Sequence, residues 1–257
     1  MKIKNFLKKY LPTSIVSFCW LIKHPEIQFK RWTAKYNYNE DGLITTHFPS
    51  FVEDDKFITC YNSAVKETSS DPAIRWRTHT IIWAANRGKN LDGDFVECGV
   101  NRGFLSKIAM DYIGFEELPK TFFLLDTYEG LVEKYLTEEE KKAGKKEGGY
   151  EPCYEKVLNT FKDYKNVKII KGAVPETLPQ VASKKIAYLS IDMNCVIPEI
   201  AAAEYFWDKM VSGAAIILDD YGHIGHKEQR HAFDKFAKNK KVDILCLPTG
   251  QGIILKS

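Results

Sequence analysis

The chain has 257 residues, of which 44% are hydrophobic and 28% charged, with a formal net charge of +3. This length suffices for one large α/β domain or two small ones. The near balance of charge, without a Lys/Arg stripe interleaved with aromatic residues, argues against nucleic acid as a partner. Six scattered cysteines without a CxxC pair predict reduced, mostly buried thiols in a cytoplasmic protein.

Residues 1–70 are expected to form an N-terminal helical arm or cover. Residues 1–23 begin with basic residues and contain an apolar stretch, which is too short to span a bilayer and is not followed by a signal-cleavage site. Two interpretations are open. The arm packs on the body or on another subunit, favouring a homodimer or higher homo-oligomer, or it lies as a basic amphipathic segment on the inner face of the membrane.

Two helices are expected before the first strand, at residues 57–69 and 71–88. Asp71, followed by a proline, is the predicted N-cap of the second helix. The basic side chains of this second helix could reach a cofactor carboxylate from the helical cover. The sequence alone does not decide which of them does so: Arg75, Arg77 or His79.

Short apolar runs alternate with amphipathic segments from residue 91 onward. The expected strands are 94–100, 121–126, 166–172, 185–192, 213–220, 242–248 and 252–256, and the expected helices are 104–113, 152–163, 199–211 and 226–238. This pattern predicts an α/β fold with a Rossmann-like, doubly wound sheet over residues 71–257. The last two strands predict an edge hairpin, which makes the sheet mixed. The charged segment 132–151 is either a solvated insertion or a mobile lid.

Carboxylates follow four of the first five expected strands. Ligands of open α/β sheets bind outside the carboxyl ends of the strands. Asp126, after the second strand, suits the two hydroxyls of a ribose, and Glu97, after the first, suits the amino group of an amino acid. Since no pyrophosphate-binding fingerprint is present, these residues favour S-adenosylmethionine over a dinucleotide.

Three further aspartates, Asp192, Asp219 and Asp220, follow the fourth and fifth strands. If these strands are neighbours, the carboxylates converge, and all-oxygen ligands favour Mg²⁺ or another hard divalent cation. Such an ion lowers the pKa of a bound hydroxyl and orients it for attack on a methyl group. The alternative is that Asp220 caps the next turn or helix, so that a single aspartate of the pair faces the site.

Five motifs in chain order over residues 72–256 carry a family resemblance: GDFVECGVNRG, LLDTYEGL, YLSIDMN, GAAIILDDYG and LPTGQG. Together they resemble the macrocin, mycinamicin and novobiocin sugar O-methyltransferases, the TylF-type family. The resemblance implies a class I methyltransferase fold, S-adenosylmethionine as donor, and a Mg²⁺ ion that binds adjacent hydroxyls of a sugar acceptor.

The resemblance also implies the site residues. Asp192 would be the general base, and Asp192, Asp219 and Asp220 the metal ligands. The cofactor-binding residues would be Glu97, Gly99, Val100, Asn101, Gly103, Ser106, Asp126, Thr127, Gly172, Ala173 and Asp192.

The chain departs from the family pattern at two places. Asn194 stands where relatives often carry a second acid, and a neutral amide is no base. His223 and His226 are therefore alternative proton acceptors, unless they are plain surface residues. Where relatives often read Gly-Gly-Ser, the serine here is Ser106, so its cofactor contact is in question. Gln251 either belongs to a tight turn or faces the site.

These observations predict a metal-dependent O-methyltransferase acting on a hydroxyl of a small-molecule or glycan acceptor, namely a sugar or glycoside. A non-catalytic binding or scaffold protein that retains the methyltransferase fold is the alternative from another class. An NAD-dependent enzyme acting on nucleotide sugars is disfavoured by the missing pyrophosphate fingerprint.

Overall fold

The computed structural model describes residues 37–257. Most of the predicted N-terminal arm therefore lies outside the described residues, as do the subunit contact and the membrane contact predicted for it as alternatives. Contacts divide the chain into two units. Residues 37–39 and 44–49 belong to the first, and residues 40–43 and 50–257 form the second. Strands β1 (Tyr38–Glu40) and β2 (Leu43–Thr45) pair with each other. Within the described residues, no helix has the length and apolar character needed to cross a membrane.

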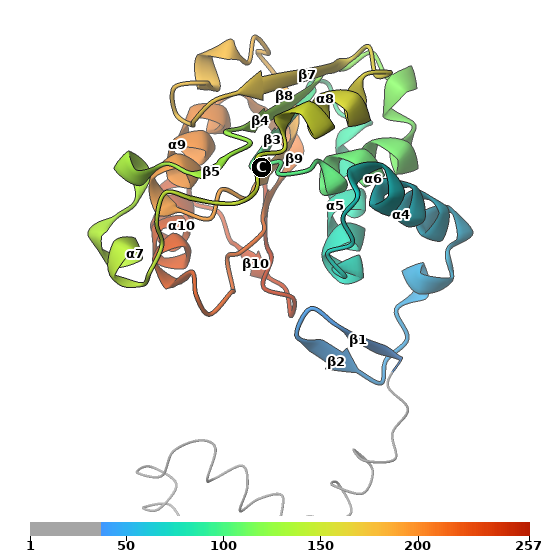
Figure 1. Ribbon diagram of the computed structural model, residues 1–257, viewed down its shortest axis with the longest axis horizontal. Coiled ribbons are helices and arrows are strands. Elements are labelled where there is room, and N and C mark those ends of the chain that lie inside the picture. Colours follow the sequence, from blue (N-terminus) through green and yellow to red (C-terminus); the bar gives the residue numbers. More distant parts are fainter. Residues whose placement is uncertain (1–36) are drawn as a thin grey trace, which may run out of the picture. The chain divides into compact units, whose positions relative to one another are not determined.

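The larger unit contains a seven-stranded sheet in the order β10-β11-β9-β8-β3-β4-β7 (Figure 1). Its strands are β3 (Asp94–Cys98), β4 (Phe122–Asp126), β7 (Val167–Lys171), β8 (Ile186–Ile191), β9 (Met210–Leu218), β10 (Leu245–Cys246) and β11 (Gly252–Leu255). The first five are parallel, whereas β11 runs antiparallel to both β9 and β10. The predicted doubly wound mixed sheet with an edge hairpin is confirmed.

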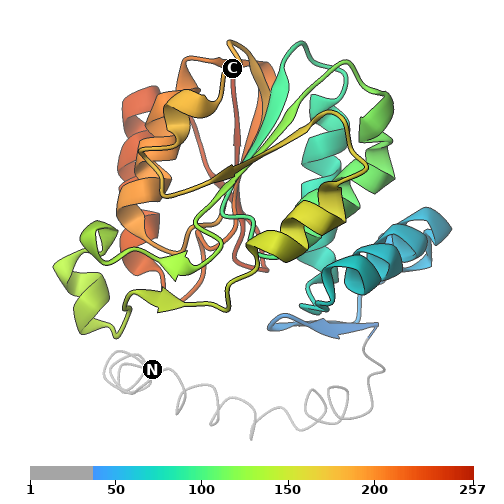
Figure 2. The same cartoon turned by 45° about the horizontal axis from the view of Figure 1, so that its top comes forward.

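Helices cover both faces of this sheet (Figure 2). They are α5 (Arg75–Gly88), α6 (Phe104–Ile113), α8 (Tyr154–Phe161), α9 (Val196–Trp207) and α10 (Lys227–Lys240), while α4 (Asp55–Thr68) packs on α6 and α8. Alternate residues of β3 face opposite cores, because side chains of a strand alternate. Val96 packs in the core with α9 and α10, and Phe95 packs in the core with α5, α6 and α8.

The start of α5 differs from the prediction. The helix begins at Arg75, and the preceding residue, Ile74, makes no side-chain cap. Asp71 Oδ1 instead accepts from the Tyr61 hydroxyl at 2.8 Å and from the Ala73 amide at 2.9 Å. Ala73 adopts φ +51°, a left-handed conformation that cannot continue a helix. Asp71 therefore ties a turn to α4 instead of capping α5.

The segment predicted to be an insertion or a lid has short elements of its own. They are β5 (Gly130–Leu131), a 3-10 helix (Glu133–Tyr135), α7 (Glu138–Lys142) and β6 (Gly148–Gly149), with β5 antiparallel to β6. Glu140 Oε1 accepts from the Val196 amide at 3.0 Å, and Lys145 Nζ donates to the Asn194 carbonyl at 2.6 Å. These bonds fasten the segment to the start of α9, and its opening as a lid stays a prediction.

The cysteines agree with the predicted reduced state within the described residues. All five are free, and the four buried ones are Cys60, Cys98, Cys153 and Cys195, while Cys246 is exposed.

Candidate active site

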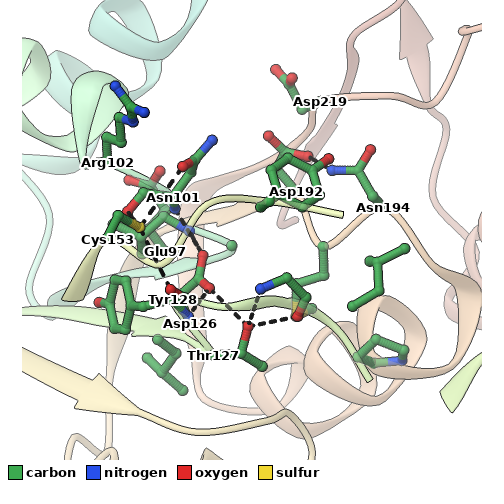
Figure 3. A pocket seen from close by; sticks show the side chains of 18 of the residues that line it. Glu97, Asn101, Arg102, Asp126, Thr127, Tyr128, Cys153, Asp192, Asn194 and Asp219 are labelled. Carbon is green, nitrogen blue, oxygen red and sulfur yellow. Dashed lines mark hydrogen bonds between the residues drawn. The ribbon is translucent and has the colours of Figure 1, made fainter. Parts of the chain in front are cut away.

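A cavity of about 320 Å³ lies at the carboxyl ends of the parallel strands. Nine of the eleven residues predicted to bind the cofactor line it: Glu97, Gly99, Val100, Asn101, Asp126, Thr127, Gly172, Ala173 and Asp192. Figure 3 shows Asp126 and Thr127 at one end, with Asp192, Asn194 and Asp219 toward the other. The strand ends thus bring the predicted residues around one space, as expected for an open α/β sheet.

Gly99 makes the sharp turn after β3, where the chain passes close to the end of β8. Its φ is +92°, and a Cβ atom there would lie 1.8 Å from the Asp192 carbonyl oxygen. The Asp192 amide donates to the Cys98 carbonyl at 2.8 Å, and the Gly99 amide donates to the Leu125 carbonyl at 2.9 Å. A residue without a side chain is therefore required for these three strand ends to meet.

The two remaining predicted cofactor residues, Gly103 and Ser106, do not line the cavity. A Cβ atom on Gly103, whose φ is +82°, would lie 2.6 Å from the Phe161 ring, so this glycine permits packing of α6 against α8. Ser106 is buried, and its hydroxyl donates to Glu97 Oε2. Ser106 thus orients Glu97, which agrees with the displacement of the serine seen in the sequence.

Glu97 is a buried carboxyl group that faces the cavity, with 2% of the residue exposed. Burial raises its pKa to about 8; the Ser106 hydrogen bond opposes this shift, and the charges of Asp219 and Asp126 add to it. A cationic group bound in the cavity would offset the cost of ionising this carboxyl.

Asp126 holds the two loops around the same end of the cavity. Its Oδ2 accepts from the amides of Val100 and Asn101 at 2.6 and 2.8 Å, and its Oδ1 accepts from the Tyr128 amide at 2.6 Å. A carboxylate has about four acceptor sites, and three amides occupy three of them, so one site remains for a ribose hydroxyl. That contact stays a prediction.

Asp192, at the end of β8, lines the opposite part of the cavity together with Asn194. The Asn194 side-chain amide donates to Asp192 Oδ1 at 2.9 Å. Burial raises the pKa of Asp192 well above its ordinary value, and the charges of Asp219 and Asp220 act in the same direction. Asn194 therefore orients the carboxyl group instead of supplying a second base.

Asp219, at the end of β9, is paired with Arg77 of α5. Arg77 Nη1 lies 2.6 Å from Asp219 Oδ2 and 4.0 Å from Asp220 Oδ1. Gln251, which is fully buried, donates to Asp219 Oδ1 at 2.9 Å. Gln251 thus reaches the site only through Asp219, because it does not line the cavity itself, and a direct contact with a ligand stays a prediction. Of the three basic candidates on α5, Arg77 is the one that lines the cavity.

The metal centre predicted from Asp192, Asp219 and Asp220 does not form as expected. β8 and β9 are neighbours, as the prediction required, but Asp220 does not line the cavity and both oxygens of Asp219 already accept hydrogen bonds. Between residues 37 and 257, no group of three His, Cys, Asp or Glu side chains could hold a metal ion. These residues do not fit the predicted ion, because the Arg77 guanidinium already pairs with Asp219 and lies close to Asp220.

The two histidines proposed as alternative bases lie outside the cavity. His223 is exposed, and its Nδ1 accepts from the Gly225 amide at 3.3 Å. His226 Nδ1 lies 3.6 Å from Asp220 Oδ2, and burial lowers the pKa of His226 against the effect of Asp220. Both histidines follow β9 in the chain, and neither ring reaches the cavity. Asp192 is therefore the remaining candidate base.

Another part of the cavity wall comes from residues 131–150, which nearly coincide with the segment expected to be a solvated insertion or a mobile lid. Four of their side chains line the cavity: Leu131, Val132, Tyr135 and Tyr150. The signal that was available is the placement of apolar and aromatic residues at the two ends of an otherwise charged stretch.

The fold and the site together define a class I methyltransferase: the strand order reverses between β3 and β8, an antiparallel hairpin closes the sheet, and a carboxyl-lined cavity lies at the reversal. The sequence model described as macrocin-O-methyltransferase (TylF) matches residues 79–245. The chain therefore belongs to this family, and it is an S-adenosylmethionine-dependent O-methyltransferase.

Solved structures share the fold at low sequence identity. The O-methyltransferase NovP is 19% identical, with a TM-score of 0.64 over 73% of this chain and 82% of NovP. The calicheamicin methyltransferase CalS11 is 14% identical, with a TM-score of 0.56 over 77% and 91% of the two chains. An O-methyltransferase from Bacillus cereus, in complex with SAH, is 13% identical, with a TM-score of 0.51 over 82% and 92%. A comparison with curated protein sequences finds no match.

Proposed function

We propose that this protein transfers the methyl group of S-adenosylmethionine to a hydroxyl of a sugar or glycoside. The observation that carries the proposal is one cavity with Glu97 and Asp126 at one end and Asp192 at the other. The family supports it, as does CalS11, a second structure of which is described as a TDP-rhamnose 3'-O-methyltransferase. The substrate named for each relative is a property of that relative and is not transferred to this protein.

The cofactor end of the cavity fits a ligand with an amino-acid part and a ribose. Glu97 would pair with the ammonium group, and the free acceptor site of Asp126 would accept from a ribose hydroxyl. Gly99 lets the backbone approach the ligand closely, while Gly172 and Ala173 would border the base. When bound there, the cofactor supplies an electrophilic methyl group.

The acceptor end would hold the hydroxyl next to Asp192. The acceptor oxygen forms a bond to the methyl carbon as the bond from that carbon to sulfur breaks, and the hydroxyl proton passes to the Asp192 carboxylate. Asn194 keeps that carboxylate in one orientation. The aromatic rings of Tyr135 and Tyr150, which line the cavity, offer apolar faces to a sugar ring and help exclude water.

Glu97 gives a prediction about proton release. Because the pKa of this buried carboxyl is raised to about 8, it is mostly protonated at pH 7, and pairing with an ammonium group would ionise it. We expect S-adenosylmethionine binding at pH 7 to release close to one proton, measured by calorimetry in buffers of different ionisation enthalpy. Release should decrease as pH rises through about 8 and disappear in Glu97→Gln.

Glu199 provides the matched control for that measurement. Its pKa is also raised to about 8 by burial, but it contacts Gln229 and the Met193 amide and does not line the cavity. Glu199→Gln should therefore bind the cofactor with unchanged proton release. Equal release by Glu97→Gln and the parent protein would show that Glu97 does not meet the ammonium group.

The function itself is tested by calorimetric titration with S-adenosylmethionine and S-adenosylhomocysteine, with NAD as the control. We expect binding of the first two at micromolar concentrations and none of NAD. Methyl transfer from labelled S-adenosylmethionine would then be screened against nucleotide sugars and glycosides. A folded protein that binds neither donor nor product would favour the scaffold interpretation, and turnover of only non-carbohydrate hydroxyls would contradict the acceptor class.

A further inference from the structure

The Arg77 guanidinium lies between three carboxylates from two parts of the chain. On one side, Nη1 is 2.6 Å from Asp219 Oδ2 and 4.0 Å from Asp220 Oδ1. On the other side, Nε and Nη2 donate to the two oxygens of Asp41 at 2.7 and 2.9 Å. Asp41 is in the turn between β1 and β2, within the same compact unit as Arg77. One fixed positive charge thus compensates the acidic end of β9.

This arrangement is largely shielded from solvent, so its charges are screened less than those of an exposed ion pair. The Arg77 side chain is 19% exposed, and that of Asp219 is 5% exposed. Burial alone would lower the pKa of Arg77, but Asp219 and Asp41 outweigh that effect and raise it, so the guanidinium stays charged. A two-pronged contact of arginine with a carboxylate is both stronger and more directional than a contact of lysine.

The contacts of Arg77 use the atoms that a divalent ion would need. Asp219 offers one oxygen to Arg77 and the other to Gln251. A divalent ion bound to Asp219 would lie against the guanidinium, and like charges at that separation repel. Asp192 also lines the cavity, and its Oδ1 accepts a hydrogen bond from the Asn194 side-chain amide. The amide nitrogen is a donor and therefore cannot ligate a metal ion.

We propose that Arg77 is the built-in counter-cation of the Asp219–Asp220 pair, and that methyl transfer by this protein needs no divalent metal ion. The second half of this inference rests on the proposed function. Arg77 acts as a positioning residue: it fixes the Asp219 carboxylate, which lines the cavity as Arg77 itself does.

The test begins with metal binding, which does not depend on turnover. MnCl₂ is titrated into the purified full-length protein, with and without S-adenosylhomocysteine, and free Mn²⁺ is followed by electron paramagnetic resonance. We expect no stoichiometric binding to the parent protein below about 1 mM. Arg77→Met, which keeps the length but removes the charge, should bind Mn²⁺ at least about tenfold more tightly. That gain should be lost in Arg77→Met combined with Asp219→Asn.

Arg75 supplies the matched control on the same helix. It pairs with Glu40, and its guanidinium carbon lies 4.6 Å from the centre of the Tyr61 ring. Arg75→Met should therefore leave Mn²⁺ binding as weak as in the parent protein. Arg77→Lys retains a positive charge and should bind Mn²⁺ as weakly as the parent protein, although it loses the two-pronged contact with Asp41. Arg77→Gln, which also removes the charge, replaces Arg77→Met if that variant does not fold.

Two results would overturn the inference. The first is binding of one Mn²⁺ by the parent protein below about 1 mM that disappears in Asp219→Asn. The second is a folded Arg77→Met variant with no gain in Mn²⁺ binding. Once an acceptor is known, turnover in EDTA should equal turnover with MgCl₂, and loss of turnover in EDTA would contradict the second half of the inference. If the proposed function is wrong, S-adenosylmethionine does not bind. The Mn²⁺ titrations still test the first half of the inference, because they do not depend on turnover.

Discussion

Replacing Asp192 by asparagine is expected to lower kcat by about 10²–10⁴-fold, the usual contribution of a general base. The substitution keeps the shape of the side chain but removes its capacity to accept the proton of the acceptor hydroxyl. Folding should not suffer, because the asparagine side chain has the same shape and its oxygen can still accept the hydrogen bond from Asn194. The measurement is kcat at saturating S-adenosylmethionine, together with thermal unfolding.

Asn194→Ala separates loss of the base from loss of its orientation. This variant removes the 2.9 Å hydrogen bond to Asp192 Oδ1 but leaves the carboxylate, so its kcat should fall by no more than about tenfold. Its kcat should thus lie between those of the parent protein and Asp192→Asn. A kcat for Asp192→Asn within a few fold of the parent value would exclude Asp192 as the base.

The arrangement of the sheet was predictable because its signals are local. Each buried strand is a short apolar run, and the carboxyl ends of parallel strands meet at one edge whatever the details of packing. The prediction therefore placed Glu97, Asp126 and Asp192 around one cavity before their contacts were known. The limits of α6, Phe104–Ile113, also agree with the sequence pattern, since helix period and flanking glycines mark them clearly.

The partner of the adjacent aspartates was not predictable in the same way. The sequence shows that Asp219 and Asp220 need a positive charge nearby, but that charge belongs to Arg77, 142 residues earlier. Which side chain of α5 points to the sheet edge depends on how the helix packs, and a local sequence pattern does not show this. The prediction also placed the start of α5 at the Asp71 cap, whereas the left-handed Ala73 delays it to Arg75. Neither the pairing of Arg77 with Asp219 nor the left-handed backbone of Ala73 is visible in a local sequence pattern.

Gly99→Ala is expected to lower the free energy of unfolding by at least about 3 kcal/mol, by combining backbone strain with overpacking. The new methyl group would lie 1.8 Å from the Asp192 carbonyl oxygen. Neither the end of β3 nor that of β8 can move freely, because the Asp192 amide bonds to the Cys98 carbonyl at 2.8 Å. The variant should therefore also displace Asp192 and weaken S-adenosylhomocysteine binding.

Gly114→Ala isolates the backbone part of that effect. Gly114 has φ +67°, also in the left-handed region, but a Cβ atom there meets nothing within 4 Å, so this variant should lose only about 1 kcal/mol. Denaturant unfolding of both variants gives the comparison, provided that the m-values agree. If Gly99→Ala were no less stable than Gly114→Ala, the close approach of β3 and β8 would not be what requires glycine at this turn. Stability loss well beyond that of Gly114→Ala, together with weakened S-adenosylhomocysteine binding, would show that the same contact fixes both the sheet and the position of Asp192.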